Sequence, residues 1–259
     1  MKDPGMFRFP TGLPGFLFSR KIEIMRRLIL LASVFLCLAA QQAFSQVKPK
    51  IYYVYDPLCG WCFAYAPIME KLADECKDQV EFVVIPGGMI VGDNVRPIRE
   101  IAPYLLQAIP QLEEISGVKM GEPYMAMLKE GSYIASSFKP SLAMVVFKSF
   151  QTGRDVAYAH KVQQSYFIEA KDIMGDSLYI ELARQFDVSP EEFMKRMSDT
   201  VYQTKTQEHF DFASYLNTKG FPSLVGKAGD SYVKITYGYL SEEESRKKIQ
   251  KFLRKQLDF

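Results

Sequence analysis

The chain has 259 residues, enough for one large domain or two small ones, and its hydrophobic content of 48% is typical of a packed globular protein. Its 32 basic and 30 acidic residues give a formal net charge of +2. No basic stripe or run of Lys and Arg stands out, so we expect no nucleic-acid partner. Four cysteines are too few for a small secreted scaffold held together by disulfides.

Residues 1–46 have the pattern of a secretory signal segment. Two arginines after Met25 precede an apolar run of about a dozen residues, and a small-x-small site follows at residues 43–45. We therefore expect translation to start at Met25, cleavage near Gln46, and a periplasmic or otherwise secreted protein. The alternative is a membrane anchor, but the run is shorter than the ~20 residues that a spanning helix needs. We expect no stable membrane anchor after cleavage.

The chain after the signal begins with a predicted strand, helix and strand. A β-branched and aromatic run predicts a strand at residues 50–56, and apolar residues at three- and four-residue spacing predict a helix from Trp61 to about Asp78. Pro67 lies inside that helix and predicts a kink. A second strand is expected at residues 80–85. Because a helix joins the two strands, we predict a parallel β-α-β unit.

A long helical segment follows, and its pattern contains no strand of any length. Helical periodicity predicts helices around residues 98–112, 140–150, 156–167, 177–186, 189–197 and 201–216. We assign residues 93–201 to a helical insertion domain. Residues 47–92 and 202–259 then form the domain that it interrupts.

Strand patterns return near the C-terminus. Residues 221–225 and 232–236 flank Ala228-Gly229-Asp230, which is typical of a β-hairpin turn. Ser241 and Glu244 have the spacing of a capping box at the start of a last helix. That helix is predicted to turn three apolar residues toward the core: Ile249, Phe252 and Leu253. The predicted fold class is α/β, with the order β-α-β … β-β-α interrupted by an all-helical insertion.

The motif Cys59-Gly60-Trp61-Cys62 falls where the first strand passes into the helix. At a helix N-terminus, unpaired N–H groups and the helix dipole favour a thiolate, the form that attacks disulfides. We expect Cys59 to be the more exposed nucleophile and Cys62 to be the shielded thiol that resolves a mixed disulfide. The same spacing fits half a zinc site, but zinc needs four ligands. Beyond the signal segment only Cys76 and two scattered histidines remain, so we expect no metal site.

Several stretches of the chain resemble one family. Residues 59–75 resemble the active-site helix of thioredoxins, including the proline five residues after the second cysteine. The whole layout resembles the DsbA family, and Gly220-Phe221-Pro222-Ser223 resembles its cis-proline loop. Three more stretches resemble the protein-disulfide-isomerase-like and FrnE-like branch of that family: residues 86–89, 137–140 and 165–173.

The resemblance implies a secreted thiol–disulfide oxidoreductase with a thioredoxin fold that acts on the cysteines of client proteins. The redox group would be the Cys59–Cys62 disulfide itself, with no metal or organic cofactor. A redox partner of unknown identity is implied, and we expect a monomer. The direction of electron flow stays open, because oxidases, isomerases and reductases share these parts.

Pro222 has two interpretations. A proline can simply open an edge strand. The resemblance instead implies a cis Phe221–Pro222 bond packed against the dithiol, which would expose the backbone of Phe221 to an extended substrate peptide. We favour this second interpretation because of the strand-to-helix placement of the cysteines.

Residues around the two cysteines are expected to tune them. DsbA proteins often have a His where Trp61 stands, and since indole cannot carry a positive charge, we expect Gly60 and Trp61 to give a less oxidising couple than that of DsbA. Trp61 has two other interpretations, a contact for unfolded substrates or a shield over the dithiol. Asp56 is either a turn residue, the commoner case, or a carboxylate proton acceptor. Cys76, on the apolar face of the helix, is expected to be a buried core thiol.

Two other functions stay open on the same fold. Small-molecule enzymes that resemble kappa-class glutathione transferases and hydroxychromene-carboxylate isomerases typically have a Ser where Cys59 stands and lack the second cysteine. A redox-silent chaperone or adaptor is the other alternative, and the signal segment disfavours a cytosolic adaptor. Only the redox function depends on both sulfurs.

Overall fold

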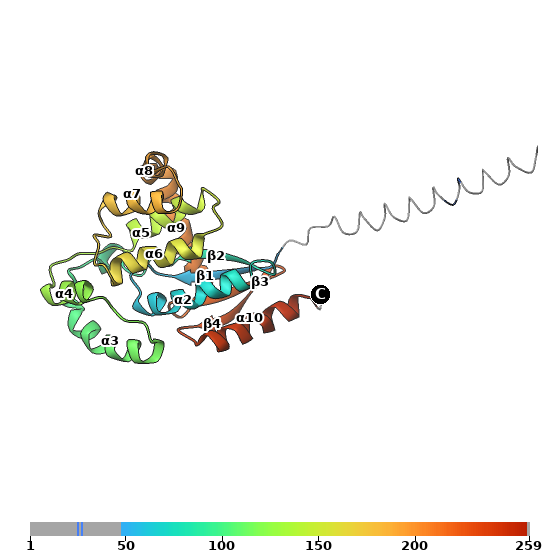
Figure 1. Cartoon of the computed structure of the whole chain (residues 1–259), viewed down its shortest axis with the longest axis horizontal. Coiled ribbons are helices and arrows are strands. Elements are labelled where there is room, and N and C mark those ends of the chain that lie inside the picture. Colours follow the sequence, from blue (N-terminus) through green and yellow to red (C-terminus); the bar gives the residue numbers. More distant parts are fainter. Residues whose placement is uncertain (1–24, 26, 28–47, 258–259) are drawn as a thin grey trace, which may run out of the picture. The chain divides into compact units, whose positions relative to one another are not determined.

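The structure is a computed structural model that describes residues 25, 27 and 48–257. The chain from Lys48 onward forms one compact unit (Figure 1). The predicted signal segment and its cleavage site lie outside the described residues and stay predictions. Within the described residues, no helix is long and apolar enough to cross a bilayer.

A four-stranded mixed sheet forms the centre of the unit. Its strand order is β2-β1-β3-β4, and the strands are β1 (Lys50–Tyr55), β2 (Glu81–Pro86), β3 (Ser223–Ala228) and β4 (Ser231–Tyr237). β1 pairs with β2 in parallel, which confirms the predicted β-α-β unit, and β3 is antiparallel to both β1 and β4. The predicted hairpin is therefore the β3–β4 pair.

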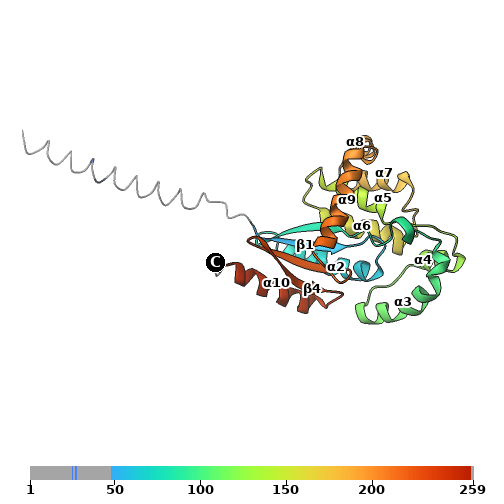
Figure 2. The same cartoon turned by 180° about the vertical axis from the view of Figure 1, so that it is seen from behind.

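Two helices cover one face of the sheet. α2 (Gly60–Glu75) joins β1 to β2, and Pro67 lies within it. α10 (Glu242–Leu257) follows β4 and packs against α2 and β4 (Figure 2). Its start is the predicted capping box, because the Ser241 hydroxyl accepts from the backbone N–H of Glu244 and donates to the Glu244 carboxylate. The three apolar residues predicted to face the core from this helix are buried: Ile249, Phe252 and Leu253.

The segment between β2 and β3 is helical, as predicted. Its helices are α3 (Ala102–Ser116), α4 (Glu122–Glu130), α5 (Phe138–Lys148), α6 (Asp155–Phe167), α7 (Asp176–Gln185), α8 (Pro190–Met197) and α9 (Thr200–Tyr215). Two short 3-10 turns precede them, η1 (Gly92–Asn94) and η2 (Ile98–Glu100). The helix predicted from residue 98 thus begins as a 3-10 turn, and α4 was not among the predicted helices.

The predicted domain boundaries stay predictions. Gly92 starts the first 3-10 turn, next to the proposed boundary at residues 92 and 93. The second boundary, at residues 201 and 202, falls inside α9. α9 packs against both α5 of the insertion and β2 of the sheet, so it contacts both proposed domains.

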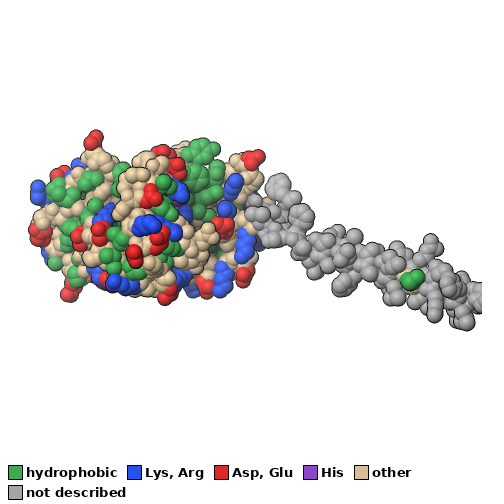
Figure 3. Space-filling model, turned by 90° about the horizontal axis from the view of Figure 1, so that it is seen from above, with side chains coloured by type: hydrophobic (Ala, Val, Ile, Leu, Met, Phe, Trp, Pro, Cys, Tyr) green, Lys and Arg blue, Asp and Glu red, His purple; other side chains and the backbone are tan. Residues whose placement is uncertain are grey.

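The alternating side chains of β1 divide the core between two faces of the sheet. Tyr53 and Tyr55 belong to the main cluster, together with the buried side of α2. Val54 belongs to a second cluster on the other face, where Ala213 of α9 and Leu216 cover it. On the molecular face shown in Figure 3, basic side chains are interspersed with acidic ones and form no single-sign stripe.

Candidate active site

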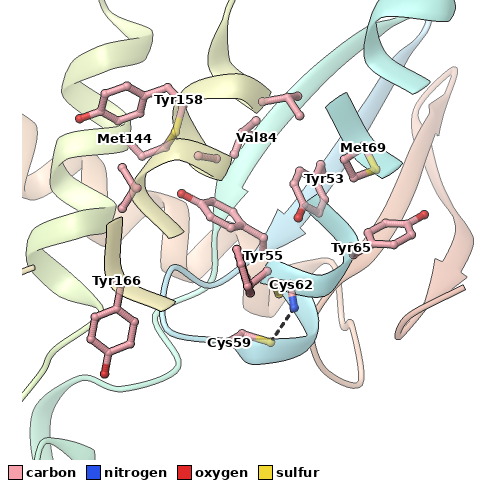
Figure 4. Packing of buried hydrophobic residues seen from close by; sticks show 14 of the residues in the cluster. Tyr53, Tyr55, Cys59, Cys62, Tyr65, Met69, Val84, Met144, Tyr158 and Tyr166 are labelled. Carbon is pink, nitrogen blue, oxygen red and sulfur yellow. Dashed lines mark hydrogen bonds between the residues drawn. The ribbon is translucent and has the colours of Figure 1, made fainter. Parts of the chain in front are cut away.

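The sulfur of Cys59 caps the N-terminus of α2. Cys59 has extended backbone angles, and its Sγ accepts a hydrogen bond from the backbone N–H of Cys62 at 3.3 Å. The N–H of Cys59 itself donates to the carbonyl of Asp56 at 3.1 Å and so fixes the preceding turn. Figure 4 shows this hydrogen bond as a dashed line, below the buried Tyr53 and Tyr55. A thiolate on Cys59 would lie where helix N–H groups and the helix dipole stabilise negative charge.

The two sulfurs of the motif differ in access to solvent. Cys59 is 8% exposed and Cys62 is 0% exposed, so Cys59 is the more exposed of the two, as predicted. Burial raises the pKa of the Cys62 thiol well above its ordinary value, and the hydrogen bond and charge of Cys59 act in the same direction. Both are free thiols. Cys59 is therefore the sulfur of this pair that an incoming disulfide can reach first.

The loop before β3 lies against the Cys59 sulfur. The Phe221–Pro222 peptide bond is cis, as the resemblance implied. The Cys59 thiol faces the carbonyl oxygen of Phe221, with 3.8 Å between Sγ and O. The alternative interpretation of Pro222, the opening of an edge strand, is wrong, because β3 lies between β1 and β4.

Two glycines after β2 make room for aromatic rings, Gly87 for Phe221 and Gly88 for Phe210. A Cβ atom on Gly87 would lie 2.2 Å from carbon atoms of the Phe221 ring. This distance is too short for any side chain at position 87 unless the ring moves. At Gly88, which has φ of +68°, a Cβ would lie 2.8 Å from the ring of Phe210. The sequence carried a signal here, because residues 86–89 are one of the stretches that resemble the family, but the packing of Gly87 against Phe221 was not predicted.

Asp56 is a turn residue, the commoner of its two predicted roles, and it is also a buried junction between distant segments. Its Oδ1 accepts from the N–H of Leu58 at 2.9 Å and from the hydroxyl of Ser137 at 2.8 Å, and its Oδ2 accepts from the N–H of Met89 at 2.7 Å. Burial raises the pKa of Asp56 to about 6, although these hydrogen bonds lower it. The side chain of Gln163 donates to the Asp56 carbonyl at 3.1 Å. Asp56 thus ties the active-site turn to the helical insertion.

A largely apolar cavity of about 570 Å³ opens beside the dithiol. Trp61 lies at this cavity and also packs against Tyr239, with ring centroids 5.7 Å apart. The cavity reaches across α3, α4 and α6. The residues that line it are Leu58, Cys59, Gly60, Trp61, Met89, Ile90, Asn94, Arg96, Ile98, Ile101, Tyr104, Leu105, Ala108, Ile109, Leu112, Met120, Tyr124, Ala135, Tyr166 and Phe167. The lining includes buried aromatic residues of the insertion, among them Tyr124, Tyr166 and Phe167.

Cys76, His160 and His209 are not among the residues that line this cavity. Cys76 is buried at the end of α2, as predicted. His160 contacts Glu70, with 2.9 Å between Nδ1 and the carboxylate, and burial lowers the pKa of His209 to about 3. Among the described residues, no three His, Cys, Asp or Glu side chains are grouped as metal ligands would be.

Comparison with solved structures identifies several similar folds. A candidate protein disulfide isomerase from Nitrosomonas europaea is 19% identical and superposes with a TM-score of 0.72, covering 80% of this chain and 98% of that one. The cytosolic disulfide reductase DsbM from Pseudomonas aeruginosa is 21% identical with a TM-score of 0.66, covering 79% and 98%. A 2-hydroxychromene-2-carboxylate isomerase is 15% identical with a TM-score of 0.57, covering 81% and 98%.

Sequence comparison gives the family. No curated protein matches the chain significantly. A family model described as thioredoxin matches residues 52–232, which run from within β1 through the whole helical insertion to Tyr232 of the β3–β4 hairpin. The chain therefore belongs to this thioredoxin family, and its fold is the DsbA-like form in which helices are inserted between the two halves of the thioredoxin domain.

Proposed function

We propose that the chain is a thiol–disulfide oxidoreductase that acts on the cysteines of client proteins. The observation that carries the proposal is the placement of the Cys59 sulfur. It caps a helix N-terminus, faces the Phe221 carbonyl and lies in front of the fully buried Cys62. This arrangement provides a stabilised thiolate, a backbone acceptor for a bound peptide, and a second sulfur protected from solvent.

The exchange proceeds in two consecutive steps. The Cys59 thiolate attacks one sulfur of a client disulfide, forms a Cys59–client disulfide and releases the other client sulfur as a thiolate, which takes up a proton. Cys62 then loses its proton and attacks the Cys59 sulfur. This step forms the Cys59–Cys62 disulfide and releases the second client thiolate. Two electrons pass from the protein to the client, and an oxidase runs the same steps in reverse.

The setting of Cys62 affects the second step. Its raised pKa keeps it protonated until the mixed disulfide has formed. Asp56 lies close enough that its negative charge also raises the pKa of Cys62. Since burial brings the pKa of Asp56 to about 6, this carboxylate is a suitable acceptor for the Cys62 proton, the sharper of its two predicted roles.

The proposal includes the location, oligomeric state, cofactor and redox partner that the sequence predicts. The protein would act in the periplasm or another secreted location after its signal segment is removed. It would work as a monomer, use the Cys59–Cys62 disulfide without metal or organic cofactor, and exchange electrons with a separate redox partner. The fold alone is compatible with a small-molecule isomerase as well, but the two sulfurs favour redox chemistry.

Single cysteine variants test the proposal. With a peptide disulfide as substrate, Cys59→Ser should abolish exchange, and Cys62→Ser should accumulate a mixed disulfide that mass spectrometry detects. Cys76→Ser is the matched control, because it removes a buried thiol at the far end of α2. No exchange by the wild-type protein would refute the redox function and favour the redox-silent chaperone. Alkylation trapping in cells then gives direction: mostly oxidised Cys59 and Cys62 indicate an oxidase, and mostly reduced ones an isomerase or reductase.

A further inference from the structure

A second cavity, of about 640 Å³, lies at one edge of the sheet. The second half of α2, the outer strand β2, the end of α5 and the start of α6 line it, and we call it the β2-edge cavity. It shares no described lining residue with the cavity beside Cys59. Its volume lies within the range of small-molecule sites in proteins.

One wall of the β2-edge cavity is apolar. Val80 and Val156 are buried in it, and Ala73, Phe82 and Ala157 are half-buried. These side chains come from three different elements and their neighbouring turns, yet all of them pack on the main core. An apolar group of a ligand would therefore leave water when it covers this wall, which favours binding.

Most of the charged side chains that line the β2-edge cavity already have an acidic or basic partner within 4 Å. These pairs are Asp74–Lys77, Glu70–His160, Glu81–Lys50 and Arg154–Asp187. Among the described residues of the lining, the charged side chains without such a partner are Lys148 and Asp155. The cavity thus contains one unpaired positive group and one unpaired negative group.

Lys148 and Asp155 line the same cavity without forming an ion pair. The Lys148 ammonium donates one hydrogen bond, to the Val84 carbonyl at 2.8 Å, which leaves two N–H groups for another acceptor. The Asp155 carboxylate accepts no hydrogen bond from the described residues. Burial lowers the pKa of Lys148 to about 8 and raises that of Asp155. The attraction between the two groups therefore does not offset their loss of water.

We propose that the β2-edge cavity binds a free α-amino acid with an apolar side chain, whose carboxylate contacts Lys148 and whose ammonium contacts Asp155. The side chain of the ligand would cover the apolar wall. A small molecule is favoured over an extended polypeptide, because Lys148 covers the edge of β2 at the Val84 carbonyl, where an added strand would have to bond. The binding is noncovalent, and neither sulfur of the dithiol takes part in it.

Three ligands with the same branched side chain measure the two charged contacts. Leucine carries both charges, isocaproate is leucine without the ammonium, and isoamylamine is leucine without the carboxylate. In isothermal titration calorimetry on the whole chain, we expect leucine to bind at least about tenfold more tightly than either analogue, because each analogue leaves one half-buried charge unpaired. No measurable binding of leucine, or equal affinity for all three ligands, would overturn the proposal.

Glycine measures the apolar wall. It carries both charges and has no side chain, so it should bind at least about tenfold more weakly than leucine. Glycine that binds as tightly as leucine would overturn the apolar specificity.

Variants of the two charged residues locate the site. Lys148→Met should bring the affinities for leucine and isoamylamine close together, because the ligand carboxylate then meets no cation. Asp155→Asn should do the same for leucine and isocaproate. Lys77→Met is the matched control, since Lys77 lines the same cavity but is paired with Asp74, and it should keep the wild-type ratios. Wild-type ratios in folded Lys148→Met or Asp155→Asn would overturn the assignment.

The Lys148 variant needs a check of folding, because Lys148→Met removes the hydrogen bond to the Val84 carbonyl. Circular dichroism provides this check. If Lys148→Met does not fold, Lys148→Gln keeps an N–H donor without the charge and should equalise the same two affinities. A folded Lys148→Gln protein that still prefers leucine to isoamylamine by the wild-type ratio would overturn the role of Lys148.

Discussion

The sulfur of Cys59 lies 3.8 Å from the carbonyl oxygen of Phe221, although the two residues are 162 positions apart in the sequence. The sheet register brings them together. β1 and β3 are antiparallel, and Val54 pairs with Ser223, so the turn that follows β1 meets the loop that precedes β3. The contact thus depends on the strand order, and we expect changes behind either residue to affect the dithiol.

The first prediction concerns the packing behind Phe221. Gly87→Ala would place a methyl group where the Phe221 ring lies, at 2.2 Å. Because Gly87 has no positive φ, the added methyl group meets the ring rather than a forbidden backbone conformation. We expect the free energy of unfolding to fall by about 1–3 kcal/mol, the usual cost of overpacking, and disulfide exchange to slow because Phe221 must move.

A double-mutant cycle tests this cause. In a Phe221→Ala background the ring is absent, so Gly87→Ala should cost little further stability in urea unfolding. The same loss in both backgrounds would mean that Gly87 is required for a reason other than the ring.

The second prediction concerns the pH dependence of stability at Asp56. Burial raises its pKa from 3.8 to about 6, so between these pH values the folded protein holds a proton that the unfolded chain has released. Stability from this group is therefore present below pH 4 and is lost as the pH rises through 6. The loss should approach about 3 kcal/mol, from about two pKa units at about 1.4 kcal/mol each.

Asp56→Asn should remove this pH dependence. Urea unfolding at pH 4, 5, 6 and 7 should show that the stability of the variant rises relative to the wild type as the pH increases, whatever its absolute value. Asp93→Asn removes an exposed carboxylate and serves as the matched control. Parallel stability curves for wild type and Asp56→Asn would contradict the prediction.

Local patterns predicted most of the fold, because they act over a few residues. The strand run before Cys59, the helical spacing after it and the Ser241–Glu244 capping box all had their physical cause within one or two turns of chain. The resemblance added the cis bond before Pro222. The first turn of the predicted helix at residue 98 differs, since the N–H of Ile98 donates to the Tyr133 carbonyl, a distant partner that no local pattern contains.

The part of the candidate site that sequence could not predict depends on distant contacts. Asp56 was open between two roles because its partners, Met89 and Ser137, come from segments 33 and 81 residues away. The packing of Gly87 could not be predicted because its neighbour, the Phe221 ring, belongs to the other half of the fold. The cavity could not be predicted because it forms only where three inserted helices pack against the active-site turn.

The third prediction concerns the N-terminus. If residues 1–46 are a signal segment, the protein recovered from the cell envelope should begin near Gln46. N-terminal sequencing measures this directly. The double substitution Leu30→Arg and Leu31→Arg places two charges inside the apolar run. It should leave the precursor uncleaved, since a signal needs an uninterrupted apolar core. A mature end well upstream of Gln46 would contradict both the cleavage site and the expected loss of any anchor.

The last prediction concerns Trp61 and the redox potential. Trp61→His places an imidazole between the two cysteines, and its protonated form would stabilise the Cys59 thiolate of the reduced protein. A more stable reduced form makes a more oxidising couple, so we expect the potential to rise by at least about 30 mV, which corresponds to a tenfold change in the equilibrium constant. Trp61→Phe keeps an aromatic ring against Tyr239 without adding a charge and should change the potential much less.

Titration against glutathione measures the potential of the wild type and of both variants. The wild type should be less oxidising than DsbA, whose potential is about −120 mV. A wild-type potential equal to that of DsbA would show that other groups near Cys59 replace the missing imidazole.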